Sequence, residues 1–208
     1  MPDQSQARVH VANRAFLKIG MPASYSSEGE FGESGTVDLL WDGVAAEVTA
    51  AYDFSDFRKT FSLEKLAGTP GNSWAFGFRL PSERIGEPLA ILDRVAPVEH
   101  YLREFMIEAG CVYTNIDPVW ARCRVMQDPQ YWDQGITEGF ATALAAAFAI
   151  PFKQDEDLQA QKREEAFGAP REMYGGGIFG RLIALNRAAQ PQGRRFMDDD
   201  PLTSARWG

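Results

Sequence analysis

Residues 139–152 read GFATALAAAFAIPF, a stretch of fourteen residues that contains six alanines and no charged side chain. A helix that is apolar on all sides must be buried on all sides. Because the stretch is shorter than the roughly 20 residues that span a bilayer, we expect a central packing helix and no membrane contact. Pro151 is predicted to end this helix, because proline lacks the N–H that continues a helical ladder.

The side chains of this helix differ in size between its two faces. A bulky stripe recurs every fourth residue, formed by Ile136, Phe140, Leu144 and Phe148. The opposite face carries Ala141, Ala145 and Ala149. Small side chains let a second helix approach closely, so we predict these alanines as subunit-packing residues, against a helix of the same subunit or of the next one.

The composition narrows the class of protein. At 208 residues, 45% of them hydrophobic, the chain can bury one large core, or a core and a small appended domain. The net charge of −8 argues against a general electrostatic attraction to nucleic acid or anionic lipid. The first residues lack the basic and apolar regions of a secretory signal, so we expect the chain in the cytoplasm. Cys111 and Cys123 are predicted to be buried free thiols, with pairing across a hairpin as the alternative.

Helical spacing of apolar residues predicts helices at both ends of the sequence. The first runs from residue 8 to residue 19, and the second from 37 to 52 with Thr36 as its cap. Residues 155–167 form a charged pattern that predicts a surface helix, and 178–189 a short one. These helices, with the alanine-rich one, predict a mainly helical bundle.

The middle of the sequence changes period after the turn cluster at residues 68–73. Short aromatic or β-branched runs then predict strands, at residues 89–95, 101–107, 111–115 and 119–125. They indicate a small antiparallel sheet. Asp128-Pro129 ends this region, and Asp133 is placed to cap the alanine-rich helix.

A glycine-rich motif is the most enzyme-like feature of the sequence. Gly175, Gly177 and Gly180 fit the spacing G-x-G-x-x-G, and Asp198 follows at the distance of a ribose-binding acid. A nucleotide site also needs a buried strand before the motif, and residues 163–174 are too charged for one. We therefore interpret the glycines as a flexible hinge, with no catalytic or cofactor-binding residue.

Metal binding has little support in the spacing of possible ligands. The four possible ligands considered for zinc are His10, His100, Cys111 and Cys123. None of them forms a closely spaced C-x-x-C or H-x-x-x-H pair, so no metal site is predicted.

The C-terminal part is basic within an acidic protein. Its arginines are Arg171, Arg181, Arg187, Arg194 and Arg195. They fit either a surface helix that balances acidic neighbours or an arm that meets an acidic partner. Trp207 at the end of the chain favours docking in a pocket, since tryptophan and arginine often carry interface energy.

Several motifs follow one another in a characteristic order. They are NRAFLKIG at 13–20, YDFSDFRK at 52–59, FSLEKLA at 61–67, WAFGFRLP at 74–81, VYTN at 112–115 and ARWG at 205–208. Over residues 12–152 this order resembles the tail tubular protein A family, the head-to-tail adaptor of short-tailed bacteriophages. The resemblance implies a structural protein of the virion tail or neck, assembled in the host cytoplasm, with no catalytic residue and no cofactor.

The resemblance also implies the partners. Such adaptors form a homo-oligomeric ring of twelve subunits that docks beneath the portal protein and carries the tail nozzle protein. DNA passes through the lumen without specific binding, and no membrane is involved.

Together, these patterns predict an α+β fold of three parts. Residues 1–66 and 128–190 form a helical bundle, 67–127 an inserted small antiparallel β domain, and 191–208 an extended C-terminal docking tail. The predicted portal-docking residues are Arg194, Arg195, Leu202, Arg206 and Trp207. Two alternatives remain: the head-tail connector of a long-tailed phage or gene-transfer particle, and a nucleotide-binding enzyme that uses the glycine motif.

Overall fold

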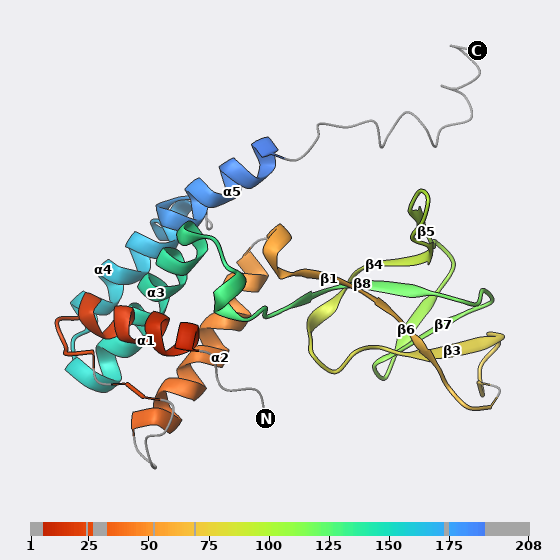
Figure 1. The fold of residues 1–208 in the computed structure, drawn as a ribbon, viewed down its shortest axis with the longest axis horizontal. Coiled ribbons are helices and arrows are strands. Elements are labelled where there is room, and N and C mark those ends of the chain that lie inside the picture. The colour runs from red at the N-terminus through yellow and green to blue at the C-terminus, as the bar shows by residue number, and fades with distance from the viewer. Residues whose placement is uncertain are drawn as a thin grey trace, which may run out of the picture.

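The computed structural model describes residues 6–23, 25–26, 33–51, 53–68, 70–172 and 175–189. Within these ranges the protein combines helices with antiparallel sheets, which confirms the predicted α+β class. Figure 1 shows the helices gathered on one side and the strands on the other. The predicted docking tail at 191–208 lies outside the described residues.

The described residues contain five α-helices. They are α1 (Gln6–Lys18), α2 (Glu33–Ala51), α3 (Gln134–Phe148), α4 (Glu156–Phe167) and α5 (Gly177–Ala189). Helix α3 is the alanine-rich segment, and it contacts each of the other four helices. Its predicted cap is confirmed, because the Asp133 carboxylate accepts a hydrogen bond of 2.8 Å from the Ile136 amide. The predicted cap of α2 is wrong, because Thr36 lies inside a helix that starts at Glu33.

Aromatic side chains fill the space around α3. The Phe148 ring lies 4.7 Å from the Phe16 ring of α1, between centroids, and the Phe140 ring lies 4.6 Å from Trp41 of α2. The bulky stripe of α3 therefore packs within the chain. Gly139 leaves space on another side, where the Phe179 ring of α5 comes within 3.0 Å of the position that a Cβ would take.

The alanine face of α3 is also covered by the chain itself. Ala141, Ala145 and Ala149 each have 0% exposure. Helices of the same chain surround α3, so no surface is left at these residues for a second subunit. The close neighbours of these alanines are therefore helices of the same chain, one of the two alternatives that the sequence left open.

The sequence predicted that Pro151 ends this helix, but the helical path runs past the proline. It continues into a π-helical turn over Ala149–Lys153, where the Gln154 amide donates to the Ala149 carbonyl five residues back as well as to the Ile150 carbonyl. A π turn is wider than an α turn, which leaves room for a residue without an N–H. The continuous segment Gln134–Lys153 is long and apolar enough to cross a membrane by length and composition alone, yet most of it is buried by the chain, as in a core helix.

The strands form two four-stranded antiparallel sheets instead of the one expected. The first sheet has the order β1-β8-β4-β5, and the second β2-β3-β7-β6. The first contains β1 (Arg58–Ser62), β8 (Trp120–Val125), β4 (Arg84–Arg94) and β5 (His100–Tyr101). The second contains β2 (Glu64–Lys65), β3 (Phe76–Arg79), β7 (Cys111–Thr114) and β6 (Met106–Glu108). Residues 58–65, assigned from sequence to the helical part, therefore belong to the sheets.

Both sheets contribute to a second hydrophobic core. Strand β8 alternates, with Ala121, Cys123 and Val125 buried and the residues between them half-buried. Ala121 and Cys123 join Phe78 and Val112 of the second sheet in one buried cluster. The helices have a separate cluster around α3.

The two thiols are free and differ in burial, which predicts unequal reactivity. Cys123 is buried, and this burial raises the pKa of its thiol, whereas Cys111 is half-buried. The thiolate is the reactive form, so a raised pKa lowers reactivity at a given pH. We expect a thiol reagent at mildly alkaline pH to modify Cys111 rapidly and Cys123 only after unfolding in guanidinium, as peptide mass mapping would show. Equal labelling of both in the native protein would contradict this.

Candidate functional site

The portal-docking residues predicted from the sequence all lie outside the described part of the chain. They are Arg194, Arg195, Leu202, Arg206 and Trp207. Asp198, the acid considered for a ribose contact, lies outside it as well. The candidate surfaces below are therefore built from other residues.

The glycine motif does not have the surroundings of a nucleotide site. Gly177 is the first residue of α5, and the described residues before it form α4 and a 3-10 turn at Pro170–Glu172. In the described residues no strand directly precedes the motif. A dinucleotide site needs such a strand to aim the helix at a pyrophosphate.

Close packing of main chain explains the glycines better than the predicted hinge. A Cβ on Gly177 would lie 2.7 Å from the carbonyl group of Ala166, and φ there is +61°. A Cβ on Gly180 would lie 2.2 Å from the Gly175 carbonyl oxygen. Only glycine fits where backbones approach this closely. The segment is thus a tight corner that joins α4 to α5.

Potential metal ligands are dispersed in the structure. His10 lies on α1, whereas His100 lies on β5 and Cys123 on β8. Among the described residues, no group of three His, Cys, Asp or Glu side chains is placed to hold a metal ion.

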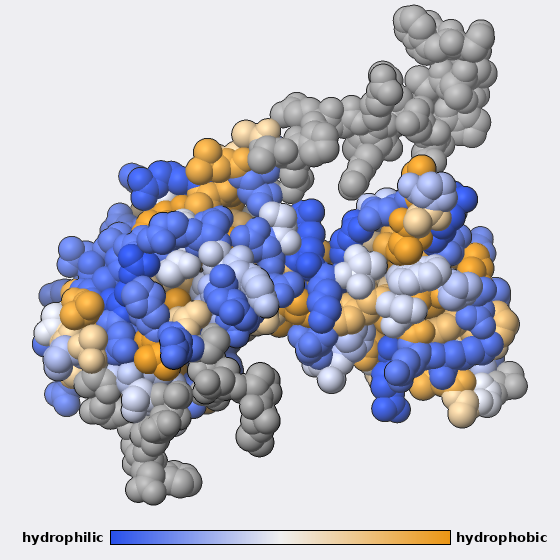
Figure 2. All heavy atoms as spheres, in the orientation of Figure 1, coloured by the Kyte–Doolittle hydropathy of each residue, from blue (hydrophilic) through white to orange (hydrophobic). Residues whose placement is uncertain are grey.

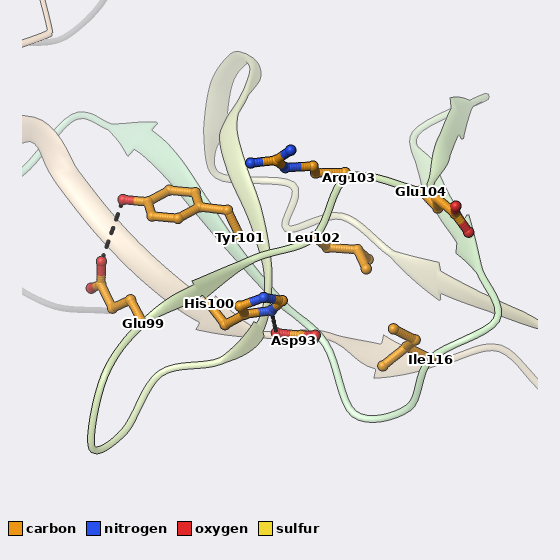
Figure 3. A pocket seen from close by; sticks show the side chains of 8 residues that line it. All are labelled: Asp93, Glu99, His100, Tyr101, Leu102, Arg103, Glu104 and Ile116. Carbon is orange, nitrogen blue, oxygen red and sulfur yellow. Dashed lines mark hydrogen bonds and ion pairs between the residues drawn. The ribbon is translucent and has the colours of Figure 1, made fainter. Parts of the chain in front are cut away.

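The first candidate surface is a hollow of about 440 Å³ where β4 turns into β5 (Figure 3). Its lining residues are Asp93, Glu99, His100, Tyr101, Leu102, Arg103, Glu104 and Ile116. They come from the ends of β4 and β5 and from the loops that follow β5 and β7. Figure 3 shows His100 turned toward Asp93 and Tyr101 turned toward Glu99.

A side-chain contact within the hairpin and an ion pair to β8 hold it in place. His100 Nδ1 lies 2.7 Å from Asp93 Oδ1, and Arg122 forms an ion pair with Glu99. The Arg122 Nη1 also donates to the Tyr101 hydroxyl at 3.4 Å. Hydrogen bonding to Glu99 raises the pKa of Arg122, so this guanidinium stays charged. The charges at the rim are therefore largely paired within the chain.

Apolar side chains accompany these pairs. Val98 at the hairpin tip is 67% exposed, and Val95, Tyr101 and Ile116 are also exposed. Large apolar side chains gathered at one end of a protein are typical of contact surfaces. The hairpin therefore has the character of a docking tip.

The second candidate surface follows α5. A wider hollow of about 800 Å³ is lined by Arg14, Gln134, Gly135, Glu138, Glu165, Ile178, Arg181, Leu182 and Leu185. Leu185 is 66% exposed. Figure 2 shows apolar atoms along the edge of the molecule where α5 lies. Glu138 is already bound by Lys18 and Arg14, and Glu165 by Lys162, so the acidic side of the hollow is neutralised.

The residues that line these two hollows include no serine, threonine or cysteine, so neither hollow holds the usual nucleophiles of acyl transfer. Comparison of the sequence with family models finds no match, and comparison with curated proteins finds no significant one. Function is therefore inferred from the arrangement of the chain.

Proposed function

We propose that the chain is a structural virion protein, a ring-forming head-to-tail adaptor. It links the portal to the tail nozzle and forms part of the DNA ejection channel. The observation that carries this proposal is the insertion of two sheets with their own core between α2 and α3 of a helical part. A connector needs separate surfaces for separate partners, and the two parts of this chain each expose one.

The surfaces suggest how the partners are distributed. Helix α5 leads directly into the C-terminal segment, whose Leu202, Arg206 and Trp207 we assign to the portal. The β4–β5 hairpin lies away from the helices (Figure 1) and carries exposed Val98, so we assign it to the nozzle. The net charge of −8 disfavours retention of DNA in the lumen, because like charge repels phosphate.

Truncation after Pro191 tests the assignment of the portal contact. The shortened chain retains every described residue, so we expect the circular dichroism signals of its helices and sheets to be retained. Binding to the purified portal protein in a pull-down is expected to be lost. A matched variant that ends after Ser204 removes only Arg206 and Trp207 among the docking candidates and should lose most of the binding. Full portal binding by the Pro191 truncation would overturn the assignment.

Two further measurements separate the alternative functions. Electron microscopy of purified particles distinguishes a short-tailed virion from a long-tailed phage or gene-transfer particle, whose connector has a different partner below it.

A thermal shift with ATP or NAD tests the nucleotide-binding alternative, because a ligand that binds only the native state raises the unfolding temperature. An increase of several degrees would favour that enzyme class over the adaptor.

A further inference from the structure

The outward side of α2 is a smooth stripe with one exposed leucine. Its exposed residues are Gly35, Leu39, Asp42, Gly43, Ala46 and Ala50. Leu39 is 75% exposed, and a Cβ placed on Gly43 would meet no atom within 4 Å. Small side chains on one helix face let a second helix lie close. Within the described chain, nothing covers this stripe at Gly43.

The α5 surface offers this stripe apolar side chains and a charge of opposite sign. It offers Ile178, Leu182 and Leu185 beside the 800 Å³ hollow, with Arg181 exposed at its side. In the described chain, neither Arg181 nor Asp42 of α2 has an ion-pair or hydrogen-bond partner. The two acids that line the same hollow, Glu138 and Glu165, are held by other cations. The free charges of the two surfaces are therefore opposite.

The spacing of the two helices also agrees. Leu39 and Ala46 are seven residues apart on α2, as are Ile178 and Leu185 on α5, which is about 10.5 Å along each helix. The charged residue lies between them in both cases, at Asp42 and Arg181. An antiparallel pair sets the two most exposed leucines of the described chain, Leu39 and Leu185, against each other and Ala46 against Ile178. Asp42 then lies three residues from the leucine contact and Arg181 four, an offset of about 1.5 Å along the axis that the long arginine side chain can span.

We propose that α2 of one subunit packs antiparallel against α5 of the next, with an Asp42–Arg181 ion pair between two apolar contacts. This inference rests on the proposed function, in which copies of the chain form a ring. The two helices present different patches, drawn at different edges of the helical part in Figure 1. A contact between different patches is heterologous, and such contacts generate closed rings or filaments.

The contact is best trapped by site-directed cross-linking. One helix pair covers less than the roughly 1,000 Å² expected of a stable interface, so a covalent trap at high protein concentration suits it better than chromatography. One full-length chain carries Leu39→Cys and the other Leu185→Cys, and both carry Cys111→Ser to remove the half-buried thiol. A short bis-maleimide reagent then reports a covalent dimer on a denaturing gel.

The heterologous geometry predicts which mixtures form the dimer. We expect the mixture of the Leu39→Cys and Leu185→Cys chains to cross-link, and each chain alone to cross-link poorly. The matched control pairs the Leu185→Cys chain with a Leu17→Cys chain, because Leu17 on α1 is also 60% exposed. The proposal is overturned if the Leu39→Cys and Leu185→Cys mixture gives no more dimer than this control. In that case another segment or another protein covers α5.

A charge exchange tests the ion pair within the same assay. Asp42→Arg on the Leu39→Cys chain should lower the dimer yield about fivefold, because it sets like charges against each other. Adding Arg181→Asp to the Leu185→Cys chain should restore the yield. If it does not, the register is wrong. Portal binding is scored separately, so a chain that cross-links but fails to bind the portal contradicts the adaptor function and leaves this contact intact.

Discussion

Gly180→Ala is expected to destabilise the protein more than any other single glycine-to-alanine change that leaves φ undisturbed. The new Cβ would lie 2.2 Å from the carbonyl oxygen of Gly175 and 2.4 Å from its carbon. Both are main-chain atoms, so no change of rotamer relieves the overlap, and α5 must move away from the corner. Overpacking of this kind costs about 3 kcal/mol, which is a large part of the stability of a typical domain.

Urea unfolding followed by circular dichroism measures this loss. The matched control is Gly43→Ala on the exposed side of α2, where a Cβ meets no atom within 4 Å. Alanine has a higher helix propensity than glycine, so this variant should gain about 1 kcal/mol. A Gly180→Ala protein as stable as the wild type would contradict the close approach of the chain at the α4–α5 corner.

The same corner shows where sequence reasoning stopped short. The spacing of Gly175, Gly177 and Gly180 indicates only that small residues are needed there, and glycine serves hinges, phosphate loops and close packing alike. These three roles of glycine differ in which atoms lie against its backbone in the folded chain. Gly177 packs against Ala166 at the end of α4, a contact between segments that no local pattern records.

Helices were predictable because their pattern is local, whereas strand β1 was missed for the opposite reason. Residues 58–62 read RKTFS, with Phe61 as the one large apolar side chain. They become β1 because they pair with β8, from Arg58 opposite Arg124 to Ser62 opposite Trp120. The partner strand, distant in sequence, decides the structure of such a polar strand.

The docking hairpin was missed for a related reason. Its rim depends on Glu99 reaching Arg122 on another strand, and on Asp93 meeting His100 across the turn. Those contacts follow from the register of β4 with β8 and β5, which a sequence alone does not give. Val98 beside Pro97 was the available signal, because it lies between the strands predicted at 89–95 and 101–107, where an apolar side chain has no core to enter.

Phe140→Ala is the second large effect that we expect, and it tests the centre of the helical part. The Phe140 ring is fully buried, 4.6 Å from the Trp41 ring and 4.9 Å from the Trp132 ring, between centroids. It thus joins α3 to α2 and to the segment that enters α3 from β8. Removing a buried phenylalanine costs about 3–5 kcal/mol through lost burial and the cavity left behind.

Urea unfolding should show this loss, and the near-ultraviolet circular dichroism of the tryptophans should weaken, because Trp41 and Trp132 lose the ring that orders them. The control is Tyr131→Ala, which removes an aromatic side chain that is 71% exposed on the same segment. Exposed substitutions usually change stability by no more than about 0.5 kcal/mol. If both variants lost equal stability, Phe140 would not be the centre of this core. A selective loss at Phe140 would show that α3 is held by its own chain, so that a contact with another copy has to use the outer helices, as the proposed pairing of α2 with α5 does.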